Sequence, residues 1–423
     1  MERNAANGTL QTDSRVFRNA LTVSLTGFLS GFDSIVISGI NLPVRQLWGM
    51  SDWFHGAFIV SIALWGSVAG ALAGGYPTER LGRKKTLLLT GILFITASLG
   101  TALAESPYQF SAFRFIGGLA SGIGSIAAPT YIAEVSHAKD RGRLGILFQV
   151  NLVAGILIAY ISNYLLAGVG GSGGWRLMAG ATGVVALVYA LLATSIPESP
   201  RWRMHSGIVR SPITAASGLF SSKYKNLLLI TFLMVFFNQF SGISFVLFYG
   251  PQVLEQAGLG TSQSLLGGVS IGIVNLAATC VGMYFIDRAG RKQLMYAGSA
   301  GYVWNLGMMA VAFYAGWPAY VILVFMLGFI FSHAIGQGAV IWVFMAEIFP
   351  TRVRAFGQAW GAGMLNVFAG LTTLMGPVMI SRFETWTIFA GFASLMVLQW
   401  LFVVFLMPET RGVPLEELEN QLS

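Results

Sequence analysis

The sequence predicts an all-α membrane protein with twelve transmembrane helices in two pseudo-symmetric six-helix bundles. Three observations lead to this fold class. Of the 423 residues, 55% are hydrophobic and only 10% are charged, whereas a soluble domain carries about 25% charged residues. The apolar residues fall into runs of the length that crosses a bilayer, about 20 residues. Finally, several short charged motifs occur twice, at nearly the same separation.

The apolar runs are separated by connections that alternate between charged and nearly uncharged. Polar residues precede the first run, and no small-residue cleavage site follows it, so we interpret it as a retained span. In chain order, the predicted spans lie near residues 17–40, 53–77, 85–104, 108–134, 143–168, 175–195, 225–256, 262–286, 293–315, 318–347, 354–380 and 385–407.

The basic residues give an orientation. With both termini in the cytosol, 21 of the 25 lysines and arginines fall on the cytosolic side. Only Arg45, Arg176 and Arg382 fall outside, and Arg114 lies within a span. Such a bias predicts cytosolic termini. It also accounts for the net charge of +8 without a nucleic-acid partner.

The repeated motifs indicate that one half has been built twice. The offsets between the copies are 208, 213 and 211 residues. Two equivalent halves in a membrane chain favour a path between them that opens to alternate sides. The paired motifs are Glu79–Lys84 with Asp287–Lys292, Glu134 and the arginines after it with Glu347 and the arginines after it, and Pro197–Arg201 with Pro408–Arg411.

The repeat also sets the domain boundaries. We expect an N-terminal bundle over 1–200, a C-terminal bundle over 224–407 and a short cytosolic tail over 408–423. Residues 201–223 form the longest polar stretch and contain Pro212 and several serines, which predicts a short helix or a linker between the halves.

The charged residues of these motifs have two interpretations. One is that the basic residues only anchor the topology. The other is a cytosolic gate, in which Glu134 and Glu347 pair with nearby arginines when the cytosolic side is shut. Each such pair at a half-exposed surface is worth only about 0–1 kcal/mol, which suits contacts that break in every cycle. The residues predicted for this gate are Glu79, Arg80, Glu134, Arg143, Arg291, Glu347 and Arg354.

Taken together, the motifs resemble those of the sugar porter family of the major facilitator superfamily over nearly the whole chain. The matching segments are Gly31–Asp33, the two Arg-x-Gly-Arg-Lys loops, Arg114–Gly118, Tyr131–Glu134, Pro197–Trp202, Gln239–Ile243, Glu347–Pro350 and Pro408–Gly412. The resemblance implies two six-helix bundles that rock around a central site. One segment departs from the family pattern, because 202–218 leaves room for about one of the several short helices usual between the halves. This shortening is either natural or engineered.

Two ionisable residues fall within predicted spans, and such residues are costly at membrane depth unless they are paired or functional. Asp33 lies in the first span and Arg114 near the start of the fourth. One interpretation is a static ion pair between the two spans. The other is a proton switch, in which Asp33 takes up and releases a proton as its distance to Arg114 changes. By resemblance, proton-coupled sugar porters carry an acid here, whereas facilitators often carry an amide and in some cases an acid.

A sugar site needs a ring of amides and hydroxyls with one or two aromatic walls. By resemblance, Phe248 and Tyr249 form an outer gate. His333 lies within the tenth predicted span at a position that is often aromatic in the family, and it is a second candidate for proton coupling. The resemblance and the neighbouring polar positions predict substrate contacts from Gln149, Asn238, Gln239, Ser244, Gln337, Trp342 and Asn366.

Other site positions depart from the family pattern. Ile156 and Leu365 replace amides, Ser244 replaces an asparagine, and Ala339 replaces a proline. Either these positions do not touch substrate, or the site is reshaped for a different sugar, a polyol or a sugar acid. Losing one partner of a buried donor costs about 1–3 kcal/mol, so three such changes are enough to switch preference.

The sequence therefore favours a secondary transporter for a monosaccharide or related polyol, driven by proton symport. A passive facilitator and a non-transporting sugar sensor are the alternatives. No metal cluster, nucleophile elbow or phosphate loop is present in the sequence, so we expect neither an enzyme nor a cofactor. The expected partners are the sugar, protons and the bilayer, with no nucleic acid, and we expect a monomer in the plasma membrane.

Overall fold

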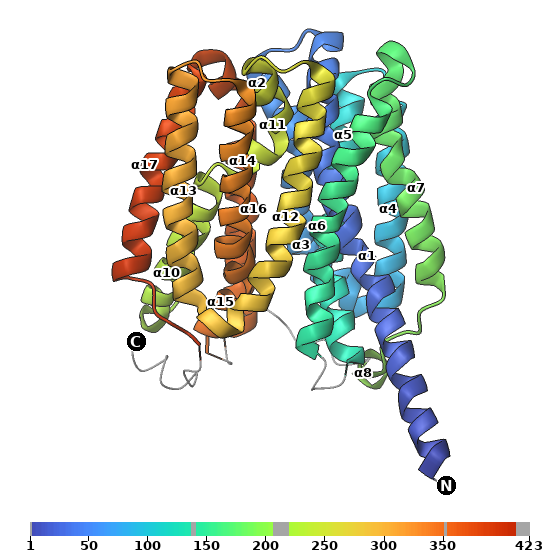
Figure 1. Ribbon diagram of the computed structural model, residues 1–423. Helices are drawn as coiled ribbons and strands as arrows, with labels where there is room; N and C mark the ends of the chain where they lie inside the picture. Colours follow the sequence, from blue (N-terminus) through green and yellow to red (C-terminus); the bar gives the residue numbers. More distant parts are fainter. Residues whose placement is uncertain (1, 137–140, 206–219, 351–352, 412–423) are drawn as a thin grey trace. The chain divides into compact units, whose positions relative to one another are not determined.

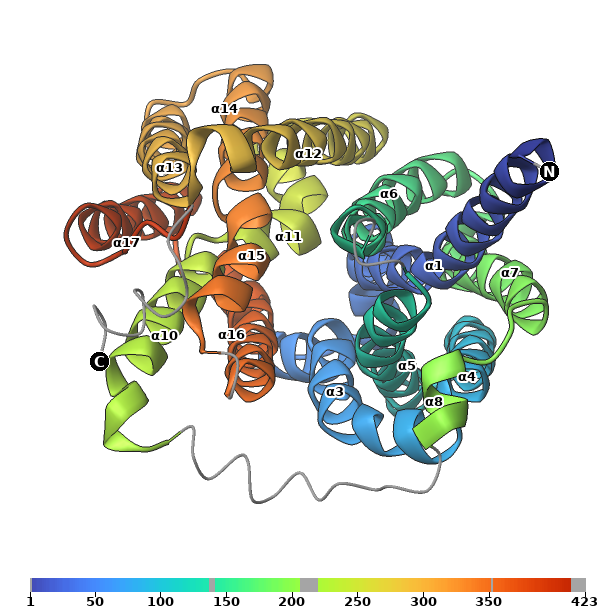
Figure 2. The ribbon, with the colours of Figure 1, turned by 90° about the horizontal axis from the view of Figure 1, so that it is seen from below.

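The computed structural model describes residues 2–136, 141–205, 220–350 and 353–411, and these residues form helices joined by short turns. Their contacts divide the chain into two compact units. The first contains residues up to Val44 and Ile62–Val209, and the second contains Arg45–Ser61 and the chain from Arg210. The ribbon views show the helices of each unit running roughly alongside one another (Figures 1 and 2).

The first unit is built from most of the long helix α1 and five further long helices. Within it, α5 packs against both α3 and α4, and α4 also packs against α7 (Figure 2). The helices are α1 (Glu2–Trp48), α3 (Ile62–Arg80), α4 (Arg83–Ala102), α5 (Pro107–Val135), α6 (Arg141–Leu166), α7 (Gly174–Thr194) and α8 (Pro200–His205), with a 3₁₀ turn, η2 (Gly171–Gly173).

The second unit includes the segment that precedes α3. In it, α13 packs against α17 and α14, and α16 packs against α10 and α11. The elements are α2 (Asp52–Phe54), η1 (His55–Val60), η3 (Ser222–Tyr224), α10 (Lys225–Phe240), α11 (Ile243–Gln256), α12 (Thr261–Ala289), α13 (Arg291–Tyr314), α14 (Ala319–His333), η4 (Ala334–Gly338), α15 (Ala339–Ile348), α16 (Arg354–Arg382) and α17 (Thr385–Phe405).

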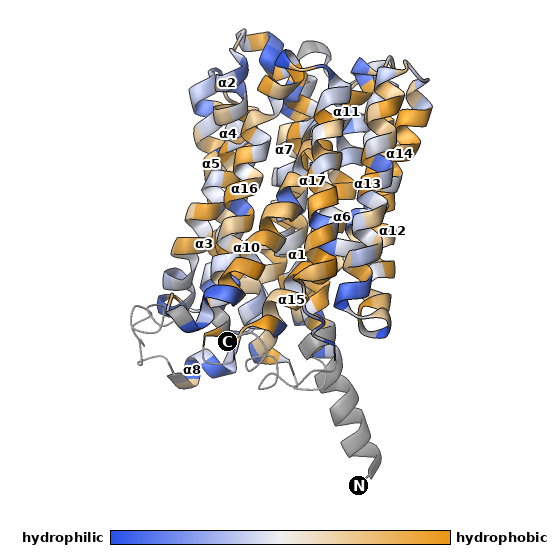
Figure 3. Cartoon of the chain, turned by 90° about the vertical axis from the view of Figure 1, so that its left-hand side faces the viewer, coloured by the Kyte–Doolittle hydropathy of each residue, from blue (hydrophilic) through white to orange (hydrophobic). Residues whose placement is uncertain are grey.

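The helices account for the predicted membrane crossings. In the described residues, 11 helical segments are long and apolar enough to span a bilayer. The predicted ninth span is not among them, but it forms α13, whose 24 residues extend about 36 Å at 1.5 Å per residue. Its lower hydropathy reflects polar and amphipathic side chains such as Ser299 and Asn305. Hydrophobic residues cover the long faces of the helices, and many hydrophilic residues lie near helix ends (Figure 3).

Close approach of α1 and α6 depends on glycine. A Cβ on Gly31 would lie 2.0 Å from the carbonyl oxygen of Leu152, and one on Gly155 would lie 2.1 Å from that of Phe28. Small residues at such crossings let helix backbones touch, which is a main source of association within membranes. This contact fixes the part of α1 that carries Asp33.

Three of the predicted spans contain an irregular segment. The seventh is broken between α10 and α11 at Gly242, which has a φ of +86°. The second and tenth contain π-helical turns, η1 and η4. Such turns are frequent at functional sites because they change the direction of neighbouring side chains. These three irregular segments are therefore candidate locations for binding residues.

The segments outside the bundles are only partly described. Of residues 201–223, the structure describes the end of α8 and residues from Phe220 onward, including η3. Residues 206–219 and the tail beyond Arg411 lie outside the described residues, so the predicted linker and cytosolic tail stay predictions.

Replacing Gly242 by alanine is expected to destabilise the second unit. A left-handed backbone costs a residue with a Cβ about 1–2 kcal/mol, and this Cβ would lie 2.6 Å from the Phe392 ring. We expect a lower midpoint of thermal unfolding in detergent. Gly391→Ala is the matched control, because a Cβ there meets nothing within 4 Å. Equal midpoints for the two variants would contradict this account of the break.

Candidate functional site

The two ionisable residues of the first unit meet as a buried ion pair. Arg114 Nη1 of α5 donates to Asp33 Oδ1 and to the Asp33 carbonyl oxygen of α1, both at 2.9 Å. The side chains are only 2% and 8% exposed. A buried pair of this kind holds two helices in one arrangement, and removing one partner leaves an uncompensated charge that costs about 3–5 kcal/mol.

This pair does not satisfy the whole guanidinium group. Arg114 Nε and Nη2 are buried and have no hydrogen-bond partner among the described residues. On the acid's other side, a Cβ on Gly117 would lie 3.2 Å from Asp33 Oδ2, so glycine leaves room for the carboxylate. A guanidinium with unused buried donors is suited to a second arrangement in which those donors find partners.

Three predicted substrate residues come together where α10 breaks into α11. Gln239 Nε2 donates to Asn238 Oδ1 at 2.8 Å, and Ser244 Oγ donates to Gln239 Oε1 at 2.7 Å. All three side chains are buried. The two bonds use one amide hydrogen and one lone pair of Gln239, and an amide offers two of each. Such a chain of amides and a hydroxyl has the chemistry to bind a polyhydroxylated molecule.

A second polar cluster lies at the π-helical turn η4. The Tyr302 hydroxyl of α13 lies 2.9 Å from His333 Nδ1 and 3.3 Å from Gln337 Oε1. Tyr302 and Gln337 are fully buried, and Gln337 Nε2 has no partner in the described chain. Sequence reasoning did not identify Tyr302, because one tyrosine in an apolar span carries no distinguishing signal.

The remaining predicted site residues have varied surroundings. Trp342 of α15 is 43% exposed, and Gln149 of α6 is half-buried. Asn366 Nδ2 donates to the Ala362 carbonyl oxygen of its own helix at 2.9 Å. The predicted gate residues Phe248 and Tyr249 are buried, and the Tyr249 hydroxyl donates to the Thr373 carbonyl oxygen of α16 at 2.7 Å.

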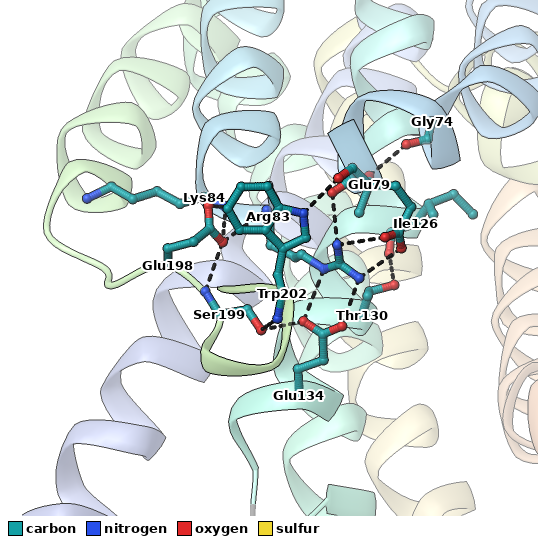
Figure 4. A network of polar contacts seen from close by, with 11 residues as sticks. Gly74, Glu79, Arg83, Lys84, Ile126, Thr130, Glu134, Glu198, Ser199 and Trp202 are labelled. Carbon is teal, nitrogen blue, oxygen red and sulfur yellow. Dashed lines mark hydrogen bonds and ion pairs between the residues drawn. The ribbon is translucent and has the colours of Figure 1, made fainter. Parts of the chain in front are cut away.

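The first copy of the charged motif forms a dense network around Arg83 (Figure 4). Its Nε and Nη2 donate to the two carboxylate oxygens of Glu134 at 3.0 and 2.9 Å. Its Nη1 and Nη2 also contact the carboxylate of Glu79 at 3.1 and 2.8 Å. The bidentate geometry is the strongest arrangement that an arginine and a carboxylate can form.

The same network includes the repeated Pro-Glu motif. The Glu198 carboxylate accepts the backbone N–H groups of Arg83 and Lys84, at 3.0 and 3.1 Å to Oε1. It thereby caps the N-terminus of α4, where a negative charge is stabilised. The turn requires glycine at Gly82, because φ is +95° and a Cβ would lie 2.4 Å from Glu198 Oε2.

The second copy repeats the main contacts of this geometry in the described residues. Arg291 Nε and Nη2 donate to the two oxygens of Glu347 at 3.0 and 2.7 Å. The Glu409 carboxylate accepts the backbone N–H groups of Arg291 and Lys292 at 3.1 and 3.0 Å. Gly290 has the same φ of +95° as Gly82. Ser199 and Thr410 also correspond, since each hydroxyl donates to the glutamate of its own copy.

The arginine at the centre of each network is not always the predicted one. Arg80 hydrogen-bonds the Tyr76 hydroxyl, and Glu134 is met by Arg83, three residues later. The repeat could have identified Arg83, because its counterpart Arg291 was already singled out. The side chains of Arg143 and Arg354 lie outside the described part of the chain, so their proposed roles are untested.

Comparisons with known proteins give one consistent result. A family model described as "Sugar (and other) transporter" matches residues 19–212 and again residues 209–422. The putative metabolite transport protein YwtG of Bacillus subtilis is 32% identical, covering 94% of this chain and 93% of its own. The glucose transporter GlcP of Staphylococcus epidermidis is 31% identical, covering 94% and 95%.

Solved structures agree with these sequence matches. An inward-open structure of the xylose transporter XylE from E. coli matches with a TM-score of 0.85 at 28% identity, covering 96% of this chain and all of that one. The D-xylose-proton symporter of E. coli strain K12 is 29% identical over 97% of this chain and 96% of its own. The likeness therefore extends over both repeats.

Arg83→Lys is expected to lower stability, because an ammonium group cannot reproduce the forked contacts with Glu134 and Glu79. Leaving the largely buried carboxylate of Glu134 without these partners costs about 1–3 kcal/mol. We expect a clear drop in the midpoint of thermal unfolding in detergent. Arg80→Lys is the control, since Arg80 is exposed and contacts only Tyr76 in the described structure. An equal, small effect of both variants would show that Arg83 is not central to the network.

Proposed function

The chain belongs to the sugar transporter family of the major facilitator superfamily, and we propose that it carries a monosaccharide or related polyol together with a proton. The membrane-spanning helices and the match of the family model to both halves support transport by this chain. The observation that carries proton coupling is the buried pair of Asp33 and Arg114. A passive facilitator is the alternative that the experiment below separates.

The coupling step follows from the electrostatics of the pair. An unpaired carboxylate is strongly disfavoured at membrane depth, whereas a protonated carboxyl group is neutral. Proton uptake on Asp33 therefore weakens its hold on Arg114 and lets α1 and α5 change their arrangement. Arg114 Nε and Nη2, which lack partners in the described structure, are the donors available to stabilise that second arrangement.

Substrate recognition is proposed for the amides and hydroxyl at the α10–α11 break. Asn238, Gln239 and Ser244 supply donors and acceptors on one connected chain, which matches the alternating character of sugar hydroxyls. Gln149, Gln337 and Asn366 are proposed as further polar contacts and Trp342 as an aromatic wall, with Phe248 and Tyr249 as the outer gate.

The charged networks are proposed to brace the cytosolic ends of the helices within each unit. The excess of lysine and arginine in alternate connections supports this orientation, with both termini in the cytosol. Each network lies within one unit and its polar groups are well satisfied. We therefore propose that the first network holds the ends of α3, α4 and α5 rigidly together, and that the second does the same for α12, α13 and α15. Contacts from Arg143 and Arg354 belong to the same proposal.

Asp33→Asn is expected to abolish uphill accumulation while leaving exchange of labelled substrate across the membrane. The amide cannot cycle a proton, yet it fills nearly the same volume. The measurement is uptake of labelled sugars into proteoliposomes with and without an imposed pH gradient. His333→Phe tests the second candidate for proton coupling and is expected to retain accumulation. Undiminished uphill uptake by Asp33→Asn would end the proposal.

The same assay separates symport from facilitation. Wild-type accumulation above equilibrium that is lost on adding an uncoupler supports symport. Equilibration alone, unchanged by the uncoupler, identifies a facilitator and leaves the substrate site proposal standing.

Gln239→Leu is expected to raise the half-saturating sugar concentration about 10- to 100-fold, because losing one or two hydrogen bonds costs about 1–3 kcal/mol. The control is Gln399→Leu, a fully buried glutamine of α17 whose amide donates to Ser299 at 2.9 Å. The readout is concentration-dependent uptake normalised to folded protein. A larger effect from Gln399→Leu would contradict the placement of the sugar site at Gln239.

A further inference from the structure

Within the second unit, α13 packs directly against the π-helical turn η4 and the end of α14. A Cβ on Gly298 of α13 would lie 2.9 Å from Gly336 Cα, and one on Gly301 would lie 2.2 Å from Ser332 Oγ. A side chain at either position would collide with this segment, so the backbone of α13 lies against it. Tyr302 comes next on α13, and its side chain starts within reach of the turn.

One hydroxyl group of α13 bridges the turn. Tyr302 is fully buried. Its oxygen lies 2.9 Å from Nδ1 of His333, the residue before η4, and 3.3 Å from Oε1 of Gln337, which lies within η4. The phenol therefore ties the start of the π-helical turn to its end.

The hydrogens available to this cluster fix the orientation of the glutamine. A phenol has one hydrogen to donate, and an amide oxygen can only accept. Both contacts therefore form at once only when His333 Nδ1 donates to the Tyr302 oxygen and the Tyr302 hydroxyl donates to Gln337 Oε1. In this order, the Gln337 amide oxygen is engaged by α13. Its two hydrogens stay available, since Nε2 is buried and has no partner among the described residues.

The turn continues into the helix that carries part of the proposed sugar site. α15 begins at the residue after η4, carries Trp342 and contacts α10, the helix of Asn238 and Gln239. Gln337 and Trp342 are both among the sugar contacts proposed above. Tyr302 has no exposed surface, so its influence on the sugar passes through the residues that it holds.

The internal repeat provides a natural comparison for this hydroxyl. At the offset of 208 residues that relates the motifs at the starts of α4 and α13, Tyr302 corresponds to Phe94. Phe94 is fully buried in an apolar cluster. The helix against which it packs, α5, is α-helical throughout Pro107–Val135. The hydroxyl and the π-helical turn thus occur together in the second half, and this part of the first half has neither.

We propose that Tyr302 is a positioning residue for sugar binding, whose hydroxyl orients Gln337 on η4 so that Gln337 Nε2 donates to a sugar hydroxyl. This inference rests on the proposed function, because it takes Gln337 as part of the sugar site. Tyr302 contacts neither the sugar nor the pair of Asp33 and Arg114. Its contribution is therefore to sugar affinity and not to the maximal rate or to proton coupling.

Tyr302→Phe tests this role, because it removes the hydroxyl and keeps the ring. We expect sugar binding about tenfold weaker, as for the loss of one hydrogen bond, with an unchanged maximal exchange rate and unchanged accumulation at saturating sugar. A merely structural role would lower the amount of folded protein or the maximal rate instead. The measurements use the reconstituted full chain with labelled glucose, xylose, arabinose and inositol, and are normalised to folded protein.

The matched control is Tyr189→Phe in the first half. Tyr189 is also buried, and its hydroxyl lies 2.9 Å from Thr26 Oγ1 and 3.2 Å from the Leu87 carbonyl oxygen. This variant loses a buried hydroxyl of the same kind, away from the proposed sugar contacts. We expect its sugar affinity to equal that of the wild type.

A double-mutant cycle tests the route through Gln337. Effects of residues that act through one another do not add, whereas those of independent residues do. Gln337→Leu alone is expected to weaken sugar binding about tenfold, through the loss of the same hydrogen bond. Adding Tyr302→Phe to Gln337→Leu is expected to cause no further loss of affinity.

Two outcomes overturn the inference and leave the proposed function standing. One is wild-type sugar affinity in Tyr302→Phe. The other is a loss of affinity from Tyr302→Phe that is as large in the Gln337→Leu background as in the wild type, because Tyr302 would then act by another route. A wild-type chain that binds none of the four probes overturns the proposed function, and this inference falls with it.

Discussion

The cost of burying charge governs this structure. In a chain that lies mostly within a bilayer, each ionisable group removed from water needs a partner or a change of protonation state. The three arginines with the least exposed side chains among the described ion pairs, Arg83, Arg114 and Arg291, each meet a carboxylate at 2.7 to 2.9 Å. Each of these pairs joins two different helices, so charge pairing also sets which helix ends lie together.

These pairs differ in how many of the arginine's hydrogen-bond donors have partners. This difference distinguishes pairs with a structural role from a pair that can change its arrangement. Arg83 and Arg291 use nearly all of their donors on carboxylates and backbone carbonyls. Arg114 uses one nitrogen and leaves two buried without partners among the residues that the structure describes. A saturated network has no better arrangement to move to, whereas an unsaturated one does. From this contrast we assign rigid support of the helix ends to the Arg83 and Arg291 networks. We assign proton sensitivity to the pair between α1 and α5.

Because the chain contains an internal repeat, its two halves can be compared as two versions of the same arrangement of helices. The end networks are conserved between the copies down to the φ of the turn glycine. The helix interiors have diverged, since the buried ion pair lies in the first half and the amide chain and Tyr302 cluster lie in the second. Within one fold, the proposed proton chemistry and most of the proposed sugar chemistry are thus assigned to different halves.

The sequence alone determined the membrane class, the predicted crossings, the doubling of the chain and the family. Each depends on composition, on the length of apolar runs or on short-range spacing, and these can be determined from the sequence without knowing how the helices pack. It also identified Asp33 and Arg114, because charges in apolar runs are conspicuous. Only the tertiary structure decided which partners meet. Arg83 and not Arg80 faces Glu134, because one helix ends at Arg80 and the next begins at Arg83 beyond a left-handed glycine, and that turn sets the direction of each side chain. Tyr302 beside His333 was equally hidden, since contacts between helices depend on rotation about the helix axis, which a nearly uniform apolar sequence leaves unspecified.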